Sequence, residues 1–96
     1  MSKVNLVVVA TINPNEKEAL SFYLEKIGKL YQEANASSVG KYKISKAVIG
    51  QYTPSLVSVM EFEDMDSYKK VFESSAYEKL LPYREKAFSK LEGYLT

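Results

Sequence analysis

VNLVVVATI, residues 4–12, runs directly into NPNE, residues 13–16, and this junction decides the fold. The first segment is short and rich in β-branched residues, which is typical of a strand, and Asn13 and Pro14 end it. The second segment offers a capping side chain in Asn13, a favourable first helical residue in Pro14 and a capping-box carboxylate in Glu16. We therefore predict a strand followed at once by a helix.

One apolar stripe follows the predicted helix start, because apolar residues recur at intervals of three and four. Its members are Leu20, Tyr23, Leu24, Ile27, Tyr31 and Ala34. This pattern predicts an amphipathic helix that ends near Asn35. Alternating residues then predict a second strand over Gly40–Ile49, and a loop with Gly and Pro leads to a third, apolar strand over Leu56–Glu63.

The last third of the sequence predicts a broken helix and a final strand. Asp64 can cap a helix over Met65–Glu73, and Ser75–Glu78 repeats the spacing of a capping box. Pro82 must kink or divide the helix that follows, because it lacks the N–H group that would bond back four residues. A strand over roughly Lys90–Leu95 completes the pattern.

The order strand, helix, two strands, helix, strand predicts an α+β, ferredoxin-like βαββαβ fold. Right-handed crossovers then place both helical segments on one face of a four-stranded antiparallel sheet. With 96 residues, the chain fits a single domain over residues 1–96. A chain this short buries only about 60–65% of its unfolded surface, so we expect the monomer to be marginally stable.

The sheet face opposite the helices is also apolar. Side chains alternate across a strand, so Val7 and Val9 of the first strand share that face with Val57 and Val59 of the third. Such a patch usually marks an association surface, and we predict a face-to-face homodimer, a dimeric α/β barrel. Glu61 falls on the same face, where an ion pair or hydrogen bond across the dimer interface is favoured over a role as general base.

Composition excludes several classes of partner and site. The net charge of +1 lacks the concentrated positive field that nucleic-acid binding requires. The longest apolar run, Leu6–Ala10, is far shorter than the roughly 18 residues of a membrane span. The start also lacks a secretory signal pattern, so we expect a cytoplasmic protein without a membrane partner. Without cysteine or histidine, neither a disulfide nor the usual zinc site can form, and we expect no metal or other cofactor.

Arg84 is an unusual member of an apolar stripe. The stripe continues through Leu80, Ala87, Phe88 and Leu91 at helical spacing, and a buried arginine needs partners. Two interpretations are open. In the more common one, the stem packs while the guanidinium reaches water or backbone carbonyls. In the other, its planar fork binds the carboxylate or oxyanion of a small ligand.

Eight tyrosines are many for so short a chain, and several of them could line a pocket for an aromatic or quinone-like ligand. A tyrosine at helical spacing is more often a core residue with its hydroxyl at the rim. We favour Tyr77 as a ligand residue because it opens the kinked helix segment, with Tyr23 as a further candidate. Lys41, Lys43 and Lys46 fall on a predicted edge strand, where protection against edge pairing is favoured over an anion site.

The segment Val59–Glu63 and a spaced set of later residues resemble the signature of a bacterial family known as domain of unknown function 1330. The later residues are Phe72, Glu73, Ser74, Tyr77, Leu80, Pro82 and Arg84. The resemblance covers essentially the whole chain. It implies the fold of the dimeric α/β-barrel proteins, which include cofactor-free monooxygenases, isomerases, haem-degrading enzymes and ligand-sensing modules.

Four positions match the family residue by residue, namely Glu61, Ser74, Tyr77 and Arg84. Three functions stay open. The favoured one is a module that binds a small aromatic or carboxylate-bearing molecule through Arg84, Tyr77, Ser74 and Tyr23. The second is a cofactor-independent monooxygenase or isomerase, in which Arg84 orients an oxyanion and Tyr77 donates a proton. The third is a structural homodimer without a ligand site. The lack of His and Trp counts against the haem-degrading branch.

Overall fold

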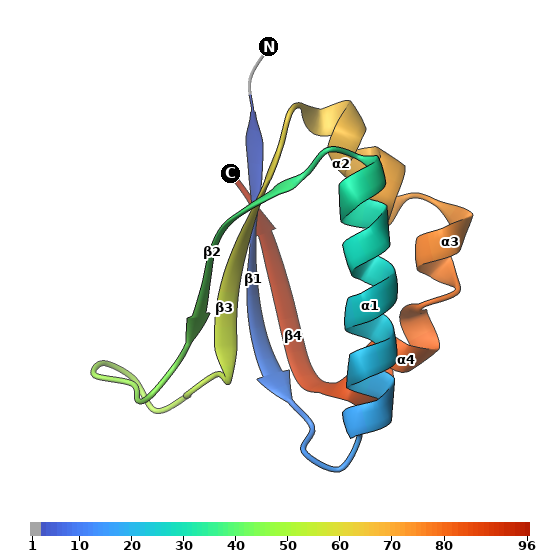
Figure 1. Ribbon diagram of the computed structural model, residues 1–96. Coiled ribbons are helices and arrows are strands. Elements are labelled where there is room, and N and C mark those ends of the chain that lie inside the picture. Colours follow the sequence, from blue (N-terminus) through green and yellow to red (C-terminus); the bar gives the residue numbers. More distant parts are fainter. Residues whose placement is uncertain (1–2) are drawn as a thin grey trace.

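The computed structural model describes residues 3–96 and confirms the ferredoxin-like α+β fold (Figure 1). Met1 and Ser2 of the predicted domain lie outside the described residues. One antiparallel sheet has the strand order β2-β3-β1-β4, and the helices cover one of its faces. The elements are β1 (Val4–Ile12), α1 (Lys17–Glu33), β2 (Ser37–Lys43), β3 (Leu56–Phe62), α2 (Met65–Phe72), α3 (Ser75–Glu78), α4 (Leu81–Ala87) and β4 (Phe88–Leu95).

The first junction differs from the sequence expectation in where the helix begins. β1 has the predicted bounds, but α1 starts at Lys17, and the capping position falls on Glu16, whose side chain makes no capping hydrogen bond. Asn13 Oδ1 instead accepts a hydrogen bond from the N–H of Asn15 at 3.1 Å. An asparagine that bonds two residues ahead forms a local turn in competition with the helix. The predicted cap at Asn13 is therefore wrong, and Pro14 lies in the turn.

The second strand is shifted toward the N-terminus. The sequence predicts Gly40–Ile49, whereas β2 spans Ser37–Lys43. The reason is the length of its partner, because Lys43 pairs with Leu56, the first residue of β3. Residues after Lys43 have no partner strand with which to continue the ladder, and they form an irregular loop.

The helix caps in the last third are set by side chains that bond to backbone N–H groups. Asp64 caps α2 as predicted, because its Oδ1 accepts a hydrogen bond from the N–H of Ser67 at 2.8 Å. The next cap is Ser74 and not Ser75, since Ser74 Oγ accepts from the N–H of Tyr77 at 3.1 Å. The capping-box interpretation of Ser75 is therefore wrong by one residue.

Pro82 divides the last helical segment as predicted. It stands in the first turn of α4, which is separated from α3 by two residues. β4 then begins at Phe88, two residues before the predicted start at Lys90, because Phe88 already pairs with Ile12. The helical spacing expected from Arg84 to Leu91 therefore stops at Ala87.

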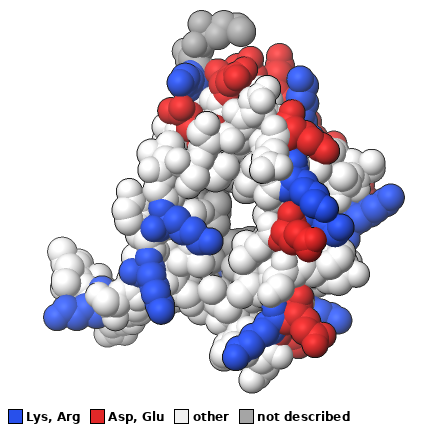
Figure 2. Space-filling view, viewed as in Figure 1, with Lys and Arg blue, Asp and Glu red and all other residues white. Residues whose placement is uncertain are grey.

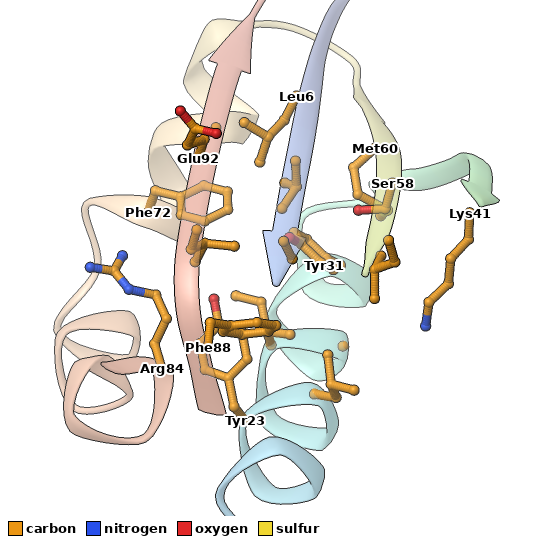
Figure 3. A pocket seen from close by; sticks show the side chains of 18 of the residues that line it. Leu6, Tyr23, Tyr31, Lys41, Ser58, Met60, Phe72, Arg84, Phe88 and Glu92 are labelled. Carbon is orange, nitrogen blue, oxygen red and sulfur yellow. The ribbon is translucent and has the colours of Figure 1, made fainter. Parts of the chain in front are cut away.

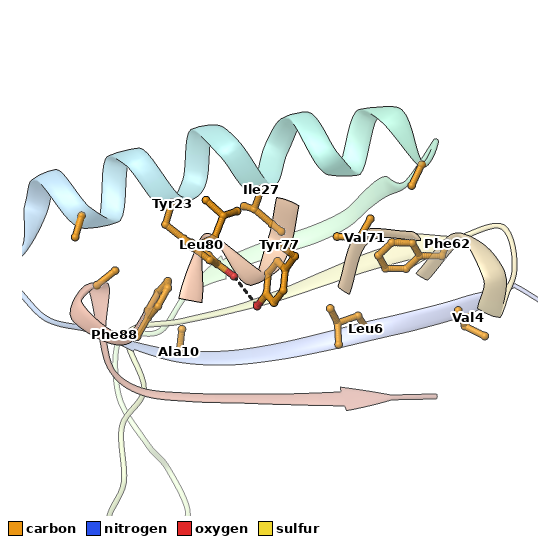
Figure 4. Close-up of a cluster of buried hydrophobic side chains, with 13 residues drawn as sticks. Val4, Leu6, Ala10, Tyr23, Ile27, Phe62, Val71, Tyr77, Leu80 and Phe88 are labelled. Carbon is orange, nitrogen blue, oxygen red and sulfur yellow. Dashed lines mark hydrogen bonds between the residues drawn. The ribbon is translucent and has the colours of Figure 1, made fainter. Parts of the chain in front are cut away.

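The core lies between the sheet and the helices (Figure 4). From β1 it takes the even-numbered residues Val4, Leu6 and Ala10, all buried. Phe62 of β3 is fully buried among aromatic rings, and its centroid lies 5.6–6.3 Å from those of Tyr31, Tyr68 and Phe72. The predicted alternation of the central strands thus holds on the helix side.

The opposite face of the sheet, which we call the open face, carries the residues predicted for it. In the sheet register Val7 pairs with Val59, and Val9 pairs with Val57. The four valines are only half-buried although they stand in the two central strands. Glu61 is on the same face and accepts a hydrogen bond from Lys3 Nζ at 3.2 Å. The valines therefore form one apolar patch that no helix covers.

Two tyrosines of the helix side should make the fold sensitive to alkali. Burial is the main cause that raises the pKa of Tyr23 and of Tyr31 well above the ordinary value of 10.0. Their folded-state pKa values exceed the unfolded ones, so their contribution to stability is complete below pH 10.0 and declines as the pH rises above it. We expect the free energy of unfolding in urea to fall less steeply above pH 10 in Tyr23→Phe and Tyr31→Phe than in the wild type.

Tyr83→Phe is the matched control for this experiment, because Tyr83 is 39% exposed. It should keep the wild-type dependence of stability on pH. Identical slopes above pH 10 for the wild type and both core variants would contradict the assignment.

Candidate functional site

A cavity of about 840 Å³ lies between α1 and the sheet. In Figure 2 it is visible as an opening at the centre of the surface. Its walls are largely apolar and aromatic, and Figure 3 shows rings of Tyr23, Tyr31, Phe72 and Phe88 around it. The elements that form the core therefore also line this cavity.

The floor of the cavity is hollow because one row of the sheet carries small side chains. Val8 of β1 is paired with Ser58 on one side and with Gly93 on the other. The rows on either side of it carry mostly larger residues, namely Met60, Leu6 and Leu95 in one and Leu56, Ala10 and Leu91 in the other. The side chains of the middle row therefore extend less far toward α1 than those of the two neighbouring rows, which leaves a hollow in the cavity floor.

The roof of the cavity has a matching gap at Gly28 of α1. A Cβ atom added to Gly28 would meet no heavy atom within 4 Å. Glycine inside a helix is about 1 kcal/mol less stable than alanine, so Gly28 destabilises α1 and also leaves space beside the helix unfilled. Gly28, Ser58 and Gly93 thus keep the centre of the fold open from both sides.

Arg84, Tyr77 and Tyr23 form a chain of hydrogen bonds in the cavity wall. Arg84 Nη1 donates to the hydroxyl oxygen of Tyr77 at 2.9 Å. The hydroxyls of Tyr77 and Tyr23 are 3.1 Å apart (Figure 4). A guanidinium can only donate, so the proton of Tyr77 is left for Tyr23 or for a molecule in the cavity.

Three helices supply this chain, and a local cap orients its central member. Tyr23 comes from α1, Tyr77 from α3 and Arg84 from α4. Ser74 donates to the carbonyl of Val71 at 2.7 Å while accepting from the N–H of Tyr77 at 3.1 Å. This pair of bonds fixes the start of α3 and therefore the direction of the Tyr77 side chain.

The chain of hydrogen bonds carries one positive charge, at Arg84. Burial, followed by the hydrogen bond with Tyr77, raises the pKa of Tyr23, while the charge of Arg84 acts in the opposite direction. Tyr23 is therefore a neutral hydroxyl at physiological pH, and Arg84 supplies positive charge. Two further charged residues line the cavity, Lys41 of β2 on the side opposite Arg84 and the acidic Glu92 of β4 (Figure 3).

The structure brings together three of the four residues predicted to bind a ligand, Arg84, Tyr77 and Tyr23. Ser74 bonds to backbone groups and supports Tyr77. Glu61 lies on the open face, on the other side of the sheet from Arg84. The predicted place of Glu61, on the sheet face opposite the helices, therefore agrees with the geometry.

Sequence reasoning missed the residues that create the space. The gap at Gly28 follows Ile27 within the apolar stripe of α1, and a glycine inside a helical pattern is a signal that could have marked it. Ser58 and Gly93 give no such signal in the sequence, because only the strand register places them in one row on either side of Val8. For Lys41 the sequence favours protection of an edge strand. The residue is indeed on one, and it also borders the cavity.

Within residues 3–96 no three side chains of His, Cys, Asp or Glu are grouped so that they could hold a metal ion. In the same part of the chain, no helix combines the length and the apolarity that crossing a membrane requires.

Comparison with solved structures places the fold among proteins of diverse description. A protein of unknown function from Rhodopseudomonas palustris is 12% identical, with a TM-score of 0.86 over 98% of this chain and 80% of that one. A dimeric protein of unknown function with a ferredoxin-like fold from Bacteroides fragilis is 10% identical, with a TM-score of 0.61 over 98% and 94% of the two chains. SnoaB, a cofactor-independent oxygenase from Streptomyces nogalater, is 11% identical, with a TM-score of 0.68 over 100% and 92%. These similarities establish the fold.

The sequence comparisons give the family. No curated protein matches the chain. The family described as domain of unknown function DUF1330 matches residues 6–92, which include β3, the three short helices and Arg84. The chain therefore belongs to the DUF1330 family.

Proposed function

We propose that the protein binds a small aromatic molecule that carries a carboxylate or another oxyanion, in the cavity between α1 and the sheet. The observation that carries this proposal is the chain Arg84–Tyr77–Tyr23 in the wall of a largely apolar cavity. Small-molecule sites have volumes of roughly 300–1,000 Å³, apolar walls and a few convergent polar groups. The cavity of about 840 Å³ meets all three conditions.

The orientation of the ligand follows from the distribution of polar groups. The planar guanidinium of Arg84 suits a carboxylate or an oxyanion, and the Tyr77 hydroxyl beside it supplies a further donor. Aromatic rings on α1, α2 and β4 offer edges and faces to an aromatic body. The anionic group of the ligand is therefore bound at Arg84, with its rings along α1.

A purely structural homodimer explains this arrangement less well. A protein selected only for stability would gain from filling the space above Val8, and Gly28 forgoes helix propensity at the point where a side chain would enter that space. The unfilled space above Val8 and the glycine at position 28 together favour a cavity with a function over a purely structural dimer.

Binding can be tested with 2-naphthoate and its neutral analogue 2-naphthamide. The carboxylate should raise the melting temperature and bind more tightly than the amide, because only the carboxylate forms a charge-assisted pair with Arg84. In Arg84→Gln the affinity for 2-naphthoate should fall about tenfold or more in isothermal titration calorimetry. In Gly28→Leu binding should be lost while thermal stability is maintained, because the new side chain occupies the cavity.

Lys86→Gln is the matched control, since Lys86 is an exposed cation on the same helix, α4. It should bind 2-naphthoate like the wild type. Equal affinities in Arg84→Gln and Lys86→Gln would remove Arg84 from the site, and binding that survives in Gly28→Leu would place the ligand elsewhere.

A second candidate is a cofactor-independent oxygenase acting on the bound aromatic molecule, with isomerisation as the related alternative. The observation that favours catalysis is that a proton donor, Tyr77, and a positive charge, Arg84, meet at one point of the wall. An oxyanion that develops there during reaction would be stabilised. The fold of SnoaB, a protein described as a cofactor-independent oxygenase, is compatible with such chemistry.

Oxygen uptake separates this candidate from simple binding. With 1,8-dihydroxynaphthalene as the test compound, an oxygenase should consume oxygen faster than buffer, and Arg84→Gln and Tyr77→Phe should each slow the uptake. A wild-type protein that binds the compound without consuming oxygen is a binding module for that compound.

We further propose that the protein is a homodimer paired through the open face. The support is the uncovered apolar patch on the central strands, and the description of the Bacteroides fragilis protein as dimeric is consistent with it. A two-fold pairing buries the same valines on both copies, which stabilises a small domain.

Sedimentation equilibrium at micromolar concentration should give the mass of a dimer. Val59→Lys should shift it toward the monomer, because a lysine in the centre of the interface would lose its hydration. Ser21→Lys, which adds the same charge at an exposed position of α1, should leave the dimer intact. A wild-type monomer at these concentrations would overturn the proposal.

A further inference from the structure

The loop between β2 and β3, residues 44–55, protrudes from the body of the molecule, and we call it the arm. It begins where the β2-β3 ladder ends, with the N–H of Ile44 donating to the carbonyl of Ser55 at 3.0 Å. In Figure 1 the arm extends away from the body of the molecule beyond the ends of both strands. In Figure 4 it leaves the sheet on the side away from α1.

The returning limb of the arm is fastened to the open face. Thr11 and Lys90 are register partners on that face, in the same alternation as Val7 and Val9. The Tyr52 hydroxyl is hydrogen-bonded to Thr11 Oγ1, and Lys90 Nζ lies 4.2 Å from the centroid of the Tyr52 ring. Tyr52 therefore lies over the open face and gives the arm a defined direction.

Two further hydrogen bonds hold the base of the arm. The N–H of Ser55 donates to the carbonyl of Ala10 at 2.7 Å, and Ser55 Oγ accepts from the N–H of Ile12 at 2.9 Å. The base is thus bound to β1, one of the two central strands, so its position is set by the fold.

The tip of the arm presents apolar side chains to solvent. Val48 is 84% exposed and Ile49 is 90% exposed, and Gly50 turns the chain with a φ of 89°. Single exposed apolar residues are common, but here two β-branched residues are adjacent, at the end of an anchored loop, beside a second uncovered apolar surface.

We infer that the arm clasps a second copy of this chain, with Val48 and Ile49 buried against the partner. The inference rests on the homodimer proposed above. Its main support is continuity with the proposed interface. The apolar tip of the arm and the four valines are two uncovered apolar surfaces on the same side of the sheet.

The direction of the arm brings its tip and the open face toward the same copy. Because the arm projects from the same side of the sheet as the four valines, a copy placed on the open face meets the arm as well. Two-fold symmetry repeats the contact, so each dimer contains two arms, each reaching over the other subunit.

The experiment compares Val48→Ser/Ile49→Ser with Val48→Leu/Ile49→Leu, which keeps the apolar character of the tip. Both pairs alter only exposed side chains, and far-UV circular dichroism verifies the fold. In sedimentation equilibrium the serine variant should raise the dimer dissociation constant by about 100-fold or more, because two side chains in each of two arms lose their burial. The leucine variant should dissociate like the wild type.

A second readout follows the tip itself. The chain has no tryptophan, so Ile49→Trp introduces a single reporter. Its emission should lie to the blue in the dimer and shift to the red on dilution, and adding Val59→Lys to the same chain should cause the red shift without dilution.

The outcomes distinguish this inference from the dimer on which it rests. A wild type that is monomeric at micromolar concentration overturns both. If the wild type is a dimer, two results overturn only the clasp and leave the tip for another partner. One is a dissociation constant that the serine variant does not change, and the other is tryptophan emission of the Ile49→Trp variant that does not respond to dilution.

Discussion

The pairing of β1 between β3 and β4 is the constraint on which the rest of the structure depends. Both edges of β1 are hydrogen-bonded to neighbouring strands, so only its two faces are left to contact other parts of the structure. Both faces of β1 are largely apolar. The even-numbered residues meet the helices and, at Val8, form the cavity floor. The odd-numbered residues form the open face, and Thr11 holds the arm. The cavity and the open face, the proposed ligand site and the proposed association surface, are thus separated by the thickness of one sheet.

The proposed binding site is built around a cation, Arg84, that the core alone does not require. Tyr77 occupies one donor of the Arg84 guanidinium, and the remaining donors are available to water or to a ligand. The tyrosine in turn depends on Ser74, whose two backbone hydrogen bonds start α3 after the break from α2. Ser74 therefore matters to the site as a positioning residue.

Sequence reasoning succeeded where local chemistry decides and failed where distant residues do. β1, the Asp64 cap, the break at Pro82 and the two faces of the central strands follow from residue type and alternation. The end of β2 could not be predicted, because it depends on where β3 begins. The cavity is harder still to predict, because Ser58, Gly93 and Gly28 are ordinary residues in separate elements. That they border one empty space can be seen only once the strand register and the helix packing are known.

The cavity and the open face are also linked through stability. An open cavity at the centre of a 96-residue chain removes contacts from a core that is already small. That loss cannot be recovered on the helix side without filling the site. The remaining apolar surface is on the other side of the same strands, and burying it against a second copy stabilises β1 and β3 without touching the floor of the cavity. In the proposed homodimer, association therefore offsets the stability lost to the cavity. The arm, tied to β1 at Thr11 and Ser55, would extend the role of the same strand to the partner.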